Sequence, residues 1–165
     1  MRVPIRKPGK YTGDKADIHF TAAKFDELKN KLEGLKKARP LAADEMRRLA
    51  EMGDLSENAA YQIAKGRLRG INDNITKLEN LLNQAVIISP KNDSGIIEIG
   101  NIVTVEMDGM RKTFTILGSS ETDPLRGIIS HHSPLGAALM GHTIGDVFFV
   151  QMGDKKISGK ILSIR

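Results

Sequence analysis

Two carboxylates, Asp54 and Glu57, stand three residues apart in a short run that separates two stretches of helical periodicity. Carboxylate oxygens are the ligands that hard cations such as Mg²⁺ prefer, so the pair could contribute to a magnesium site. Two carboxylates leave an octahedral shell incomplete, and the other ligands would have to come from another molecule. The same residues also suit helix punctuation, because Gly53 fits a helix end and Asp54 with Glu57 resembles a capping box.

Apolar residues spaced three and four apart predict a helix on each side of the acidic pair. The first helix follows Thr21, a suitable N-cap, and its seam comprises Phe25, Leu28, Leu32, Leu35, Ala42, Met46 and Leu49. The second runs from about Ser56 to about Asn83, and its seam comprises Tyr61, Ala64, Leu68, Ile71, Ile75, Leu78 and Leu82. Helices joined by a short turn lie antiparallel, so we expect a coiled-coil hairpin over residues 21–84.

Four residues in this predicted hairpin disfavour helix. Pro40 follows Arg39 in the first helix and predicts a kink near residues 38–40. Gly34, Gly66 and Gly70 each cost about 1 kcal/mol relative to alanine in a helix interior. The sequence therefore predicts a hairpin of marginal stability.

The second half of the chain, residues 96–165, has the pattern of a small sheet domain with one short helix. The expected strands are Ile102–Met107, Lys112–Leu117, Gly127–His131, Val147–Met152 and Lys156–Ile164. Asp108–Gly109 predicts a tight hairpin turn, and Ser133 with Pro134 predicts a helix start that runs to Met140. Residues 85–95 read as a linker, which makes the fold class α+β.

Charge and composition indicate the kind of partner and exclude several kinds of protein. Residues 1–83 hold 17 Lys and Arg against 12 Asp and Glu, whereas residues 84–165 hold eight of each. The basic half, which includes a flexible basic arm over residues 1–20, therefore suits a polyanionic partner, although most modestly basic segments are simply solvated faces. The absence of cysteine excludes disulfides and thiolate sites, and no membrane span or secretory signal is present, which predicts a cytoplasmic protein.

Three histidines, His131, His132 and His142, invite a metal interpretation. Adjacent residues on a strand point to opposite faces of the sheet. Because His131 falls in a predicted strand, the pair His131–His132 should be unable to chelate one ion, and the sequence predicts no histidine metal site.

Two separated motifs carry a resemblance to a known family. The tip run from Gly53 to Tyr61, with the sequence GDLSENAAY, resembles the tip signature of the bacterial Gre transcript-cleavage factors. The second half agrees with that family's C-terminal signature through Ile129-Ser130, Ser133-Pro134, Ala138-Leu139, Gly141 and Gly145-Asp146-Val147. Arg39-Pro40 also matches, and the resemblance spans residues 19–165.

The resemblance implies an N-terminal antiparallel coiled coil and a C-terminal domain of the FKBP-like fold. It implies binding to RNA polymerase as a monomer, with the C-terminal domain docked at the rim of the secondary channel through Ser133 and Pro134. Asp54 and Glu57 would then help to hold a magnesium ion of the polymerase active site and orient a water that cleaves the 3′ end of backtracked RNA. The protein would be a cofactor of polymerase, with no enzymatic activity or bound cofactor of its own.

The resemblance also gives a role to a basic group on the second helix. Lys65, Arg67 and Arg69 lie within about four helical turns of the tip, where they could hold the extruded RNA backbone. A solvated helix face is the alternative. Tyr61 could place its ring near the reacting site or pack in the seam.

Two other functions stay open at this stage. Some relatives of the Gre family occupy the secondary channel and modulate or inhibit transcription without cleavage, and the three helix glycines would suit a weakened hairpin of that kind. Prolyl isomerase activity follows only from the implied fold. Because fold does not confer function and aromatic residues make up 4% of the chain, an apolar proline pocket is not expected.

Overall fold

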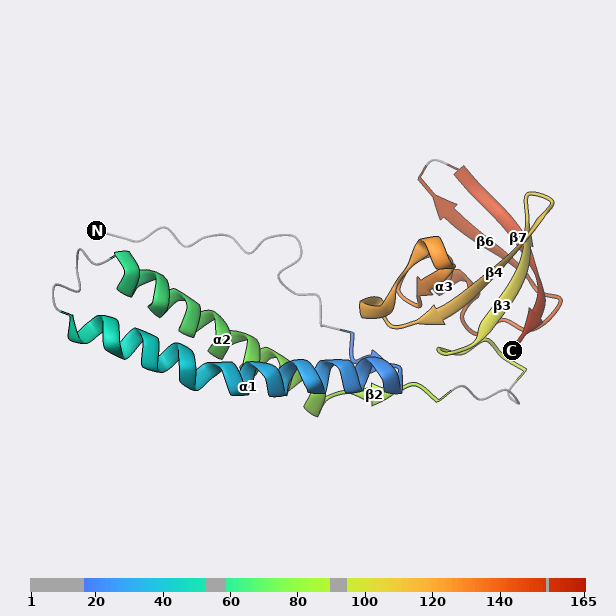
Figure 1. Ribbon diagram of the computed structural model, residues 1–165. Coiled ribbons are helices and arrows are strands. Elements are labelled where there is room, and N and C mark those ends of the chain that lie inside the picture. The colour runs from blue at the N-terminus through green and yellow to red at the C-terminus, as the bar shows by residue number, and fades with distance from the viewer. Residues whose placement is uncertain (1–16, 53–58, 90–94, 154) are drawn as a thin grey trace, which may run out of the picture.

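The computed structural model describes residues 17–52, 59–89, 95–153 and 155–165. They form a long helical hairpin and a sheet domain that lies beside one end of it (Figure 1). The hairpin consists of α1, Ala22–Glu51, and α2, Ala59–Asn83. The sheet domain comprises the described residues from 95 onward. The predicted architecture of a helical hairpin followed by a sheet domain with a short helix is confirmed.

The hairpin forms as its apolar spacing predicts. Thr21 is the N-cap of α1, and its hydroxyl oxygen accepts a hydrogen bond from the Lys24 N–H at 3.2 Å. The residues buried between the helices all belong to the predicted seam: Leu32, Ala42, Ala64 and Ile75. Among the described residues, no helix is both long and apolar enough to cross a membrane.

Neither the proline nor the glycines end a helix. α1 continues through Pro40 to Glu51, so the proline does not divide it. A β-carbon added at Gly34, Gly66 or Gly70 would meet nothing within 4 Å, because each glycine faces open space. The glycines therefore lower helix propensity without serving a close contact.

The sheet has the strand order β5-β4-β3-β7-β6. The pairs β3–β4, β3–β7 and β6–β7 are antiparallel, and β4–β5 is parallel. The strands are β3 Ile102–Met107, β4 Met110–Leu117, β5 Ile128–Ser130, β6 Val147–Met152 and β7 Lys155–Ile164. Two short 3₁₀ helices, η1 Ser119–Glu121 and η2 Pro124–Arg126, connect β4 to β5.

The turn between β3 and β4 is the tight hairpin turn predicted at Asp108 and Gly109. Asp108 and Gly109 both adopt positive φ, at 51° and 72°, and Met107 pairs with Met110 across the turn. Two successive residues with positive φ are typical of the hairpin turn whose twist matches the strands. This turn fixes the register that places the alternate residues Val103, Val105 and Met107 in the core.

The short helix α3, Pro134–Leu139, covers the core of the sheet domain. Leu135 and Leu139 are buried together with Phe148 and Ile161 of the neighbouring strands. Gly136 permits the close approach, because a β-carbon there would lie 2.0 Å from the backbone oxygen of Ser130. Glycine is thus required where α3 meets the end of β5.

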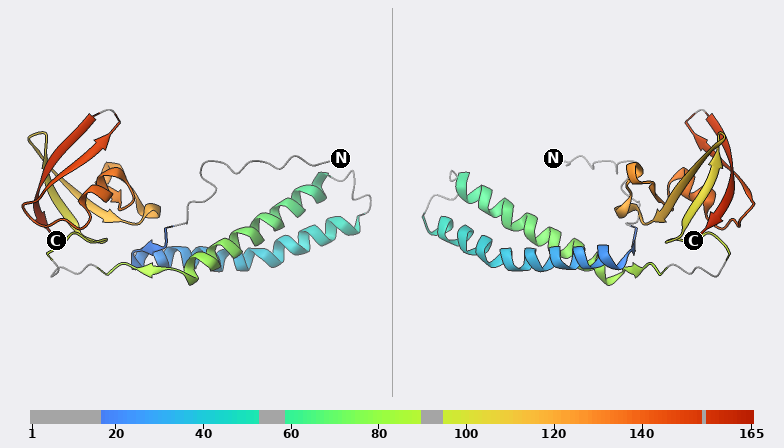
Figure 2. Two further views of the ribbon diagram at one scale, coloured as in Figure 1. Left: turned by 180° about the vertical axis from the view of Figure 1, so that it is seen from behind. Right: turned by 45° about the vertical axis from the view of Figure 1, so that its right-hand side comes forward.

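Two short parallel strands form a separate two-stranded sheet at the base of the hairpin. β1, His19–Phe20, pairs with β2, Val86–Ile87, beside the first turn of α1 (Figure 2). The predicted arm over residues 1–20 is therefore wrong at its end, because residues 17–20 are part of the folded body and Phe20 is fully buried. The predicted linker over 85–95 likewise contains a paired strand. Residues 1–16 of the predicted arm lie outside the described residues.

Candidate functional site

The acidic pair lies in the connection between the two helices. α1 ends at Glu51, with Met52 as its C-cap, and α2 begins at Ala59. These helix ends lie at the end of the hairpin that is far from the sheet domain in both views of Figure 2. Asp54 and Glu57 themselves lie outside the described residues. Since α1 has 30 residues, it spans about 45 Å, so this connection belongs to the far end of a long projection.

Lys65 and Arg69 lie on one face of α2, near the end that carries this connection. They are four residues apart, which places them one turn from each other on the same helix face. The Lys65 ammonium lies 5.9 Å from the centre of the Tyr61 ring, and the Arg69 Nε lies 4.0 Å from an Asp73 carboxylate oxygen. Both basic side chains are exposed. They are therefore accessible to an anionic partner.

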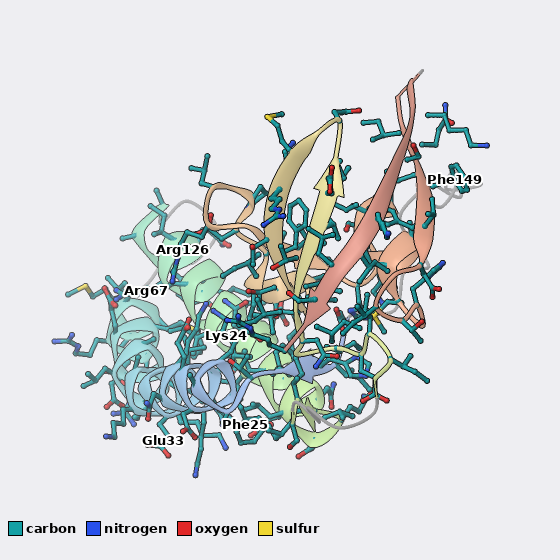
Figure 3. The ribbon with its side chains drawn as sticks, turned by 90° about the vertical axis from the view of Figure 1, so that its right-hand side faces the viewer. Lys24, Phe25, Glu33, Arg67, Arg126 and Phe149 are labelled. Carbon is teal, nitrogen blue, oxygen red and sulfur yellow. The ribbon has the colours of Figure 1, made fainter. Side chains whose placement is uncertain are left out.

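Arg67 belongs to a different face of the hairpin. A step of two residues turns an α-helix by about 200°, so Arg67 points away from Lys65 and Arg69. Its Nη1 lies 3.2 Å from the Glu45 Oε2 on α1, and Figure 3 shows this arginine on the hairpin. The three basic residues that the sequence grouped together are all exposed, but Lys65 and Arg69 share one face, whereas Arg67 forms an ion pair that bridges the two helices.

Ser133 and Pro134 start α3. The Ser133 hydroxyl donates to the Ser130 carbonyl at 2.6 Å and accepts from the Gly136 N–H at 3.0 Å. Both bonds are internal, so this serine holds the turn between β5 and α3. Pro134 occupies the first turn of α3 and is exposed. Of the two residues predicted to contact a partner, only the proline presents a free surface.

Asp146 holds the loop that leads into β6. One carboxylate oxygen accepts hydrogen bonds from the Thr143 N–H at 2.7 Å and from the Thr143 hydroxyl at 3.0 Å. These two bonds lower the pKa of Asp146 below its usual value, and His142 nearby adds a smaller electrostatic contribution. Gly145, which precedes it, has a φ of 94°. The Gly145-Asp146 motif therefore has a structural role in this loop.

Apolar side chains exposed on the sheet domain were not singled out by the sequence. Phe149 on the edge strand β6 is 60% exposed and points away from the sheet (Figure 3). Val147, two residues earlier on the same strand, is also exposed. Leu125 in η2 is 99% exposed. The unbroken run Val147–Val150 was the available signal, because a strand with only one buried face alternates apolar and polar residues. Such residues are candidates for contact with another protein.

The junction between hairpin and sheet domain was also missed. Asp17 accepts hydrogen bonds from the backbone N–H groups of Ser119 at 2.6 Å and His19 at 3.1 Å. Burial alone would raise the pKa of Asp17, but these bonds outweigh it and lower the pKa to about 2. No local pattern pointed to the contact between Asp17 and Ser119, because these residues are 102 positions apart.

The histidine prediction needs correction. β5 ends at Ser130, so His131 and His132 lie in a turn instead of a strand. Their ring centres are 3.8 Å apart, which means that both imidazoles project to the same side. The strand alternation that was expected to separate them does not apply. His142 lies elsewhere, with its Nδ1 at 3.4 Å from the Met140 carbonyl oxygen.

Comparison with known proteins agrees with this architecture. Residues 18–87 match the family model described as "Transcription elongation factor, N-terminal", and residues 91–165 match "Transcription elongation factor, GreA/GreB, C-term". The transcription elongation factor GreA of Clostridioides difficile is 41% identical over 151 residues, covering 88% of this chain and 94% of that protein. GreA of Alkaliphilus oremlandii is 39% identical over 153 residues, and the alignment covers 90% of this chain and 96% of that protein.

More distant matches span the chain as well. GreA of Thermomicrobium roseum is 33% identical over 151 residues and covers 90% of this chain and 97% of its own. The crystal structure of the GreA factor homolog Gfh1 of Thermus thermophilus is 28% identical, with 90% of this chain and 99% of that chain aligned at a TM-score of 0.41. The two family models together match 145 residues, in both parts of the fold. The chain therefore belongs to the GreA/GreB family of transcription elongation factors.

Proposed function

We propose that this protein binds RNA polymerase and stimulates the polymerase to cleave the 3′ end of a backtracked transcript. The hairpin would enter the secondary channel, and the sheet domain would dock at its rim. The observation that carries the proposal is the hairpin itself: two continuous helices, about 45 and about 38 Å long, whose connection contains Asp54 and Glu57. Family membership and GreA relatives of up to 41% identity support it.

The chemistry that this arrangement suits is hydrolysis of a phosphodiester in the polymerase active site. Asp54 and Glu57 are carboxylates, which are hard oxygen ligands of the kind that Mg²⁺ takes. Magnesium, when held there, polarises the phosphate and stabilises charge on the attacking and leaving oxygens. In our proposal the two side chains would supply two of the oxygen ligands that hold this ion and would accept a hydrogen bond from the attacking water. The reaction adds water to phosphorus and breaks its bond to the 3′ oxygen.

Lys65 and Arg69 are the residues that we assign to the extruded RNA. They share one exposed face of α2 and lie about 9 and 15 Å along the helix from its start at Ala59. Their side chains could contact phosphates in succession along a strand that passes the hairpin. Arg67 would contribute less, because its ion pair with Glu45 at 3.2 Å is closer than the 4.0 Å contact between Arg69 and Asp73.

The sheet domain offers the surface for docking on polymerase. Pro134 at the start of α3 and Leu125 in η2 are exposed, whereas the Ser133 hydroxyl caps α3 by accepting a hydrogen bond from the Gly136 N–H. We therefore assign the contact to the exposed proline and leave the serine the role of fixing its position. Because α1 and α2 are continuous through their glycines, the structure supplies no reason to favour a channel binder without cleavage activity.

The test is transcript cleavage on a stalled, backtracked elongation complex with magnesium. The wild type should shorten the RNA quickly, and the double variant Asp54→Asn, Glu57→Gln should bind polymerase but lose the stimulation. A matched control removes two charges from exposed acids near the base of α1, Asp26→Asn with Glu33→Gln, and should retain activity. Full cleavage by the tip variant would refute the proposal. Tight binding without cleavage by the wild type would assign the protein to channel occupancy instead.

A further inference from the structure

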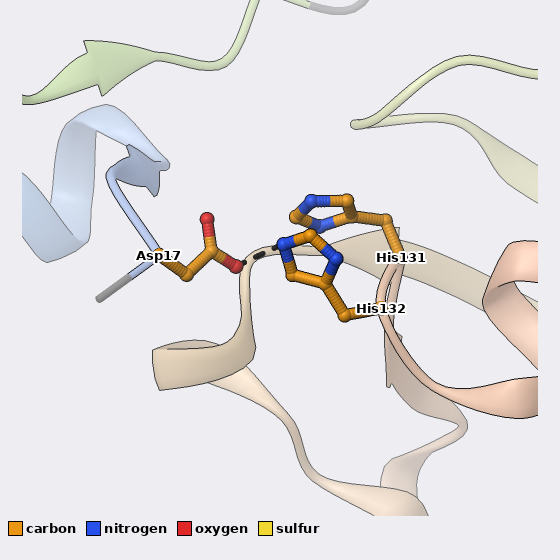
Figure 4. A group of neighbouring side chains, drawn as sticks. All are labelled: Asp17, His131 and His132. Carbon is orange, nitrogen blue, oxygen red and sulfur yellow. Dashed lines mark ion pairs between the residues drawn. The ribbon is translucent and has the colours of Figure 1, made fainter. Parts of the chain in front are cut away.

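Asp17 lies beside His131 and His132, where the segment before α1 contacts the sheet domain (Figure 4). The Asp17 side chain is 6% exposed and the His131 side chain is 10% exposed. The Asp17 Oδ2 lies 3.6 Å from the His131 Nδ1, an ion pair when the histidine is protonated. The group therefore lies at a largely buried contact between two parts of the chain that are far apart in sequence.

His132 completes the group from the exposed side. Its backbone N–H donates to the Ser130 hydroxyl oxygen at 3.1 Å, which holds the turn in which both histidines lie. Its ring is tilted by 39° against the His131 ring at 3.8 Å between centres. One ligand atom from each of Asp17, His131 and His132 lies within 4.8 Å of the other two. These three side chains therefore converge on one point.

The chemistry of the three groups is that of a transition-metal site. Imidazole nitrogen suits zinc, copper, nickel and iron, and a carboxylate oxygen is a further zinc ligand. In a tetrahedral zinc site the bonds are about 2.0–2.2 Å long, so ligand atoms lie about 3.4 Å apart. The exposed His132 ring can close the remaining distance by a change of rotamer. We propose that Asp17, His131 and His132 bind a divalent transition-metal ion, with Zn²⁺ as the ion that best fits this ligand set.

The surroundings of the site support binding. The Asp17 Oδ2 accepts a hydrogen bond from the Ser119 N–H and keeps a lone pair for an ion, whereas its Oδ1 faces both the backbone N–H and the Nδ1 of His19, at 3.1 and 3.0 Å. These hydrogen bonds hold the Asp17 carboxylate in place, as hydrogen bonds do for the ligands of known metal sites. Three protein ligands leave a fourth position for water.

A bound ion would connect the base of the hairpin to the sheet domain. Asp17 precedes the N-cap Thr21 by four residues, whereas the histidines follow β5. Because the ion would bind the native arrangement and not the unfolded chain, it would stabilise the junction in proportion to its affinity and concentration. This inference concerns a site distant from the hairpin connection and does not depend on the cleavage proposal.

The test uses the full-length protein, treated with a chelator, dialysed and titrated with Zn²⁺ in a calorimeter and with Co²⁺ in an absorption spectrometer. We expect saturation at a single equivalent, Co²⁺ bands of a low-coordinate nitrogen and oxygen site, and a higher Tm with Zn²⁺. His132→Asn, at an exposed position, should weaken binding by about tenfold or more. His142→Asn is the matched control and should bind as the wild type does.

The sequence contains four histidines and no cysteine, so adding His131→Asn and His19→Asn to these variants tests every imidazole in the chain, and Asp17→Asn tests the carboxylate. Absence of stoichiometric Zn²⁺ binding would overturn the proposal and leave the group as an ion pair. Equal weakening by His132→Asn and His142→Asn would overturn it as well, because the ion would then bind elsewhere. A loss confined to variants of Asp17, His131 or His132, with the Tm increase lost in parallel, would establish the site.

Discussion

Glu121 of the sheet domain accepts two hydrogen bonds from Thr21, the N-cap of α1, 100 residues earlier in the chain. The Thr21 N–H donates to Oε2 at 2.9 Å and its hydroxyl donates to Oε1 at 2.5 Å. The same hydroxyl oxygen caps α1 by accepting from the Lys24 N–H. A single residue therefore fixes both the start of the hairpin and its attachment to the sheet domain.

Replacing Glu121 should loosen this attachment. In Glu121→Gln one acceptor oxygen becomes an NH₂ group that faces a donor, and we expect the free energy of unfolding to fall by about 1–2 kcal/mol. Chemical denaturation measures the effect. Glu106→Gln, at an exposed position on β3, removes the same charge and should change stability by less than about 0.5 kcal/mol. Equal effects of the two variants would show that the Thr21 contact contributes nothing.

Two glycine-to-alanine substitutions should change the stability of the protein in opposite directions. Gly136→Ala would place a β-carbon 2.0 Å from the Ser130 carbonyl oxygen, so α3 must move and stability should fall by about 2 kcal/mol or more. Gly70→Ala adds a methyl group in open space and should raise stability by up to about 1 kcal/mol through helix propensity. Thermal unfolding of both variants beside the wild type measures the difference. Destabilisation by Gly70→Ala would reveal a packing role for that glycine.

Asp146 should titrate below the usual range of aspartate. Its pKa is lowered in the folded protein, so its contribution to stability is present above the unfolded-state pKa and is lost as the pH falls through the folded-state pKa. Side-chain carboxyl NMR over an acid titration measures this pKa directly. In Thr143→Val the backbone bond remains but the hydroxyl bond is lost, so the pKa should rise part of the way toward its usual value. An unchanged pKa in this variant would assign the shift to other groups.

The basic residues of α2 should differ in their effect on cleavage. The double variant Lys65→Gln, Arg69→Gln removes both accessible cations from one face, and loss of about 1.4 kcal/mol of phosphate contact would slow cleavage about tenfold. Arg67→Gln mainly breaks an exposed ion pair with Glu45 and should slow it much less. Cleavage rates on one backtracked complex at two salt concentrations compare the variants. A larger effect of Arg67→Gln would reverse our assignment of the RNA face.

Local patterns predicted the regular elements well. β3 and β6 have the expected bounds, Ile102–Met107 and Val147–Met152, because each strand borders a turn with glycine. α3 has the expected start because Ser133 caps it. In each case the deciding interaction joins residues close in sequence, which is where propensity and capping rules apply.

The junction could not be predicted in this way. Residues 17–20 carry no helical or strand period, and their partners in η1 and the turn after β5 are about 100 residues distant. The histidine turn was misjudged for a related reason: β5 ends one residue before His131, and strand ends are set by tertiary pairing. The acidic pair at Asp54 and Glu57 lies outside the described residues, so its assignment depends on the motif and family.

The parallel pair β1–β2 gives the hairpin the mechanics of a lever. Both helices leave the base through paired strands, with His19 opposite Val86 and Phe20 opposite Ile87, so they turn together. Along an arm of about 45 Å, a rotation of about 5° at the base displaces the far end by about 4 Å. That displacement exceeds the range of a hydrogen bond. In the proposed complex with polymerase, a small adjustment at Thr21 or Asp17 would therefore decide whether the hairpin connection reaches the position that cleavage requires.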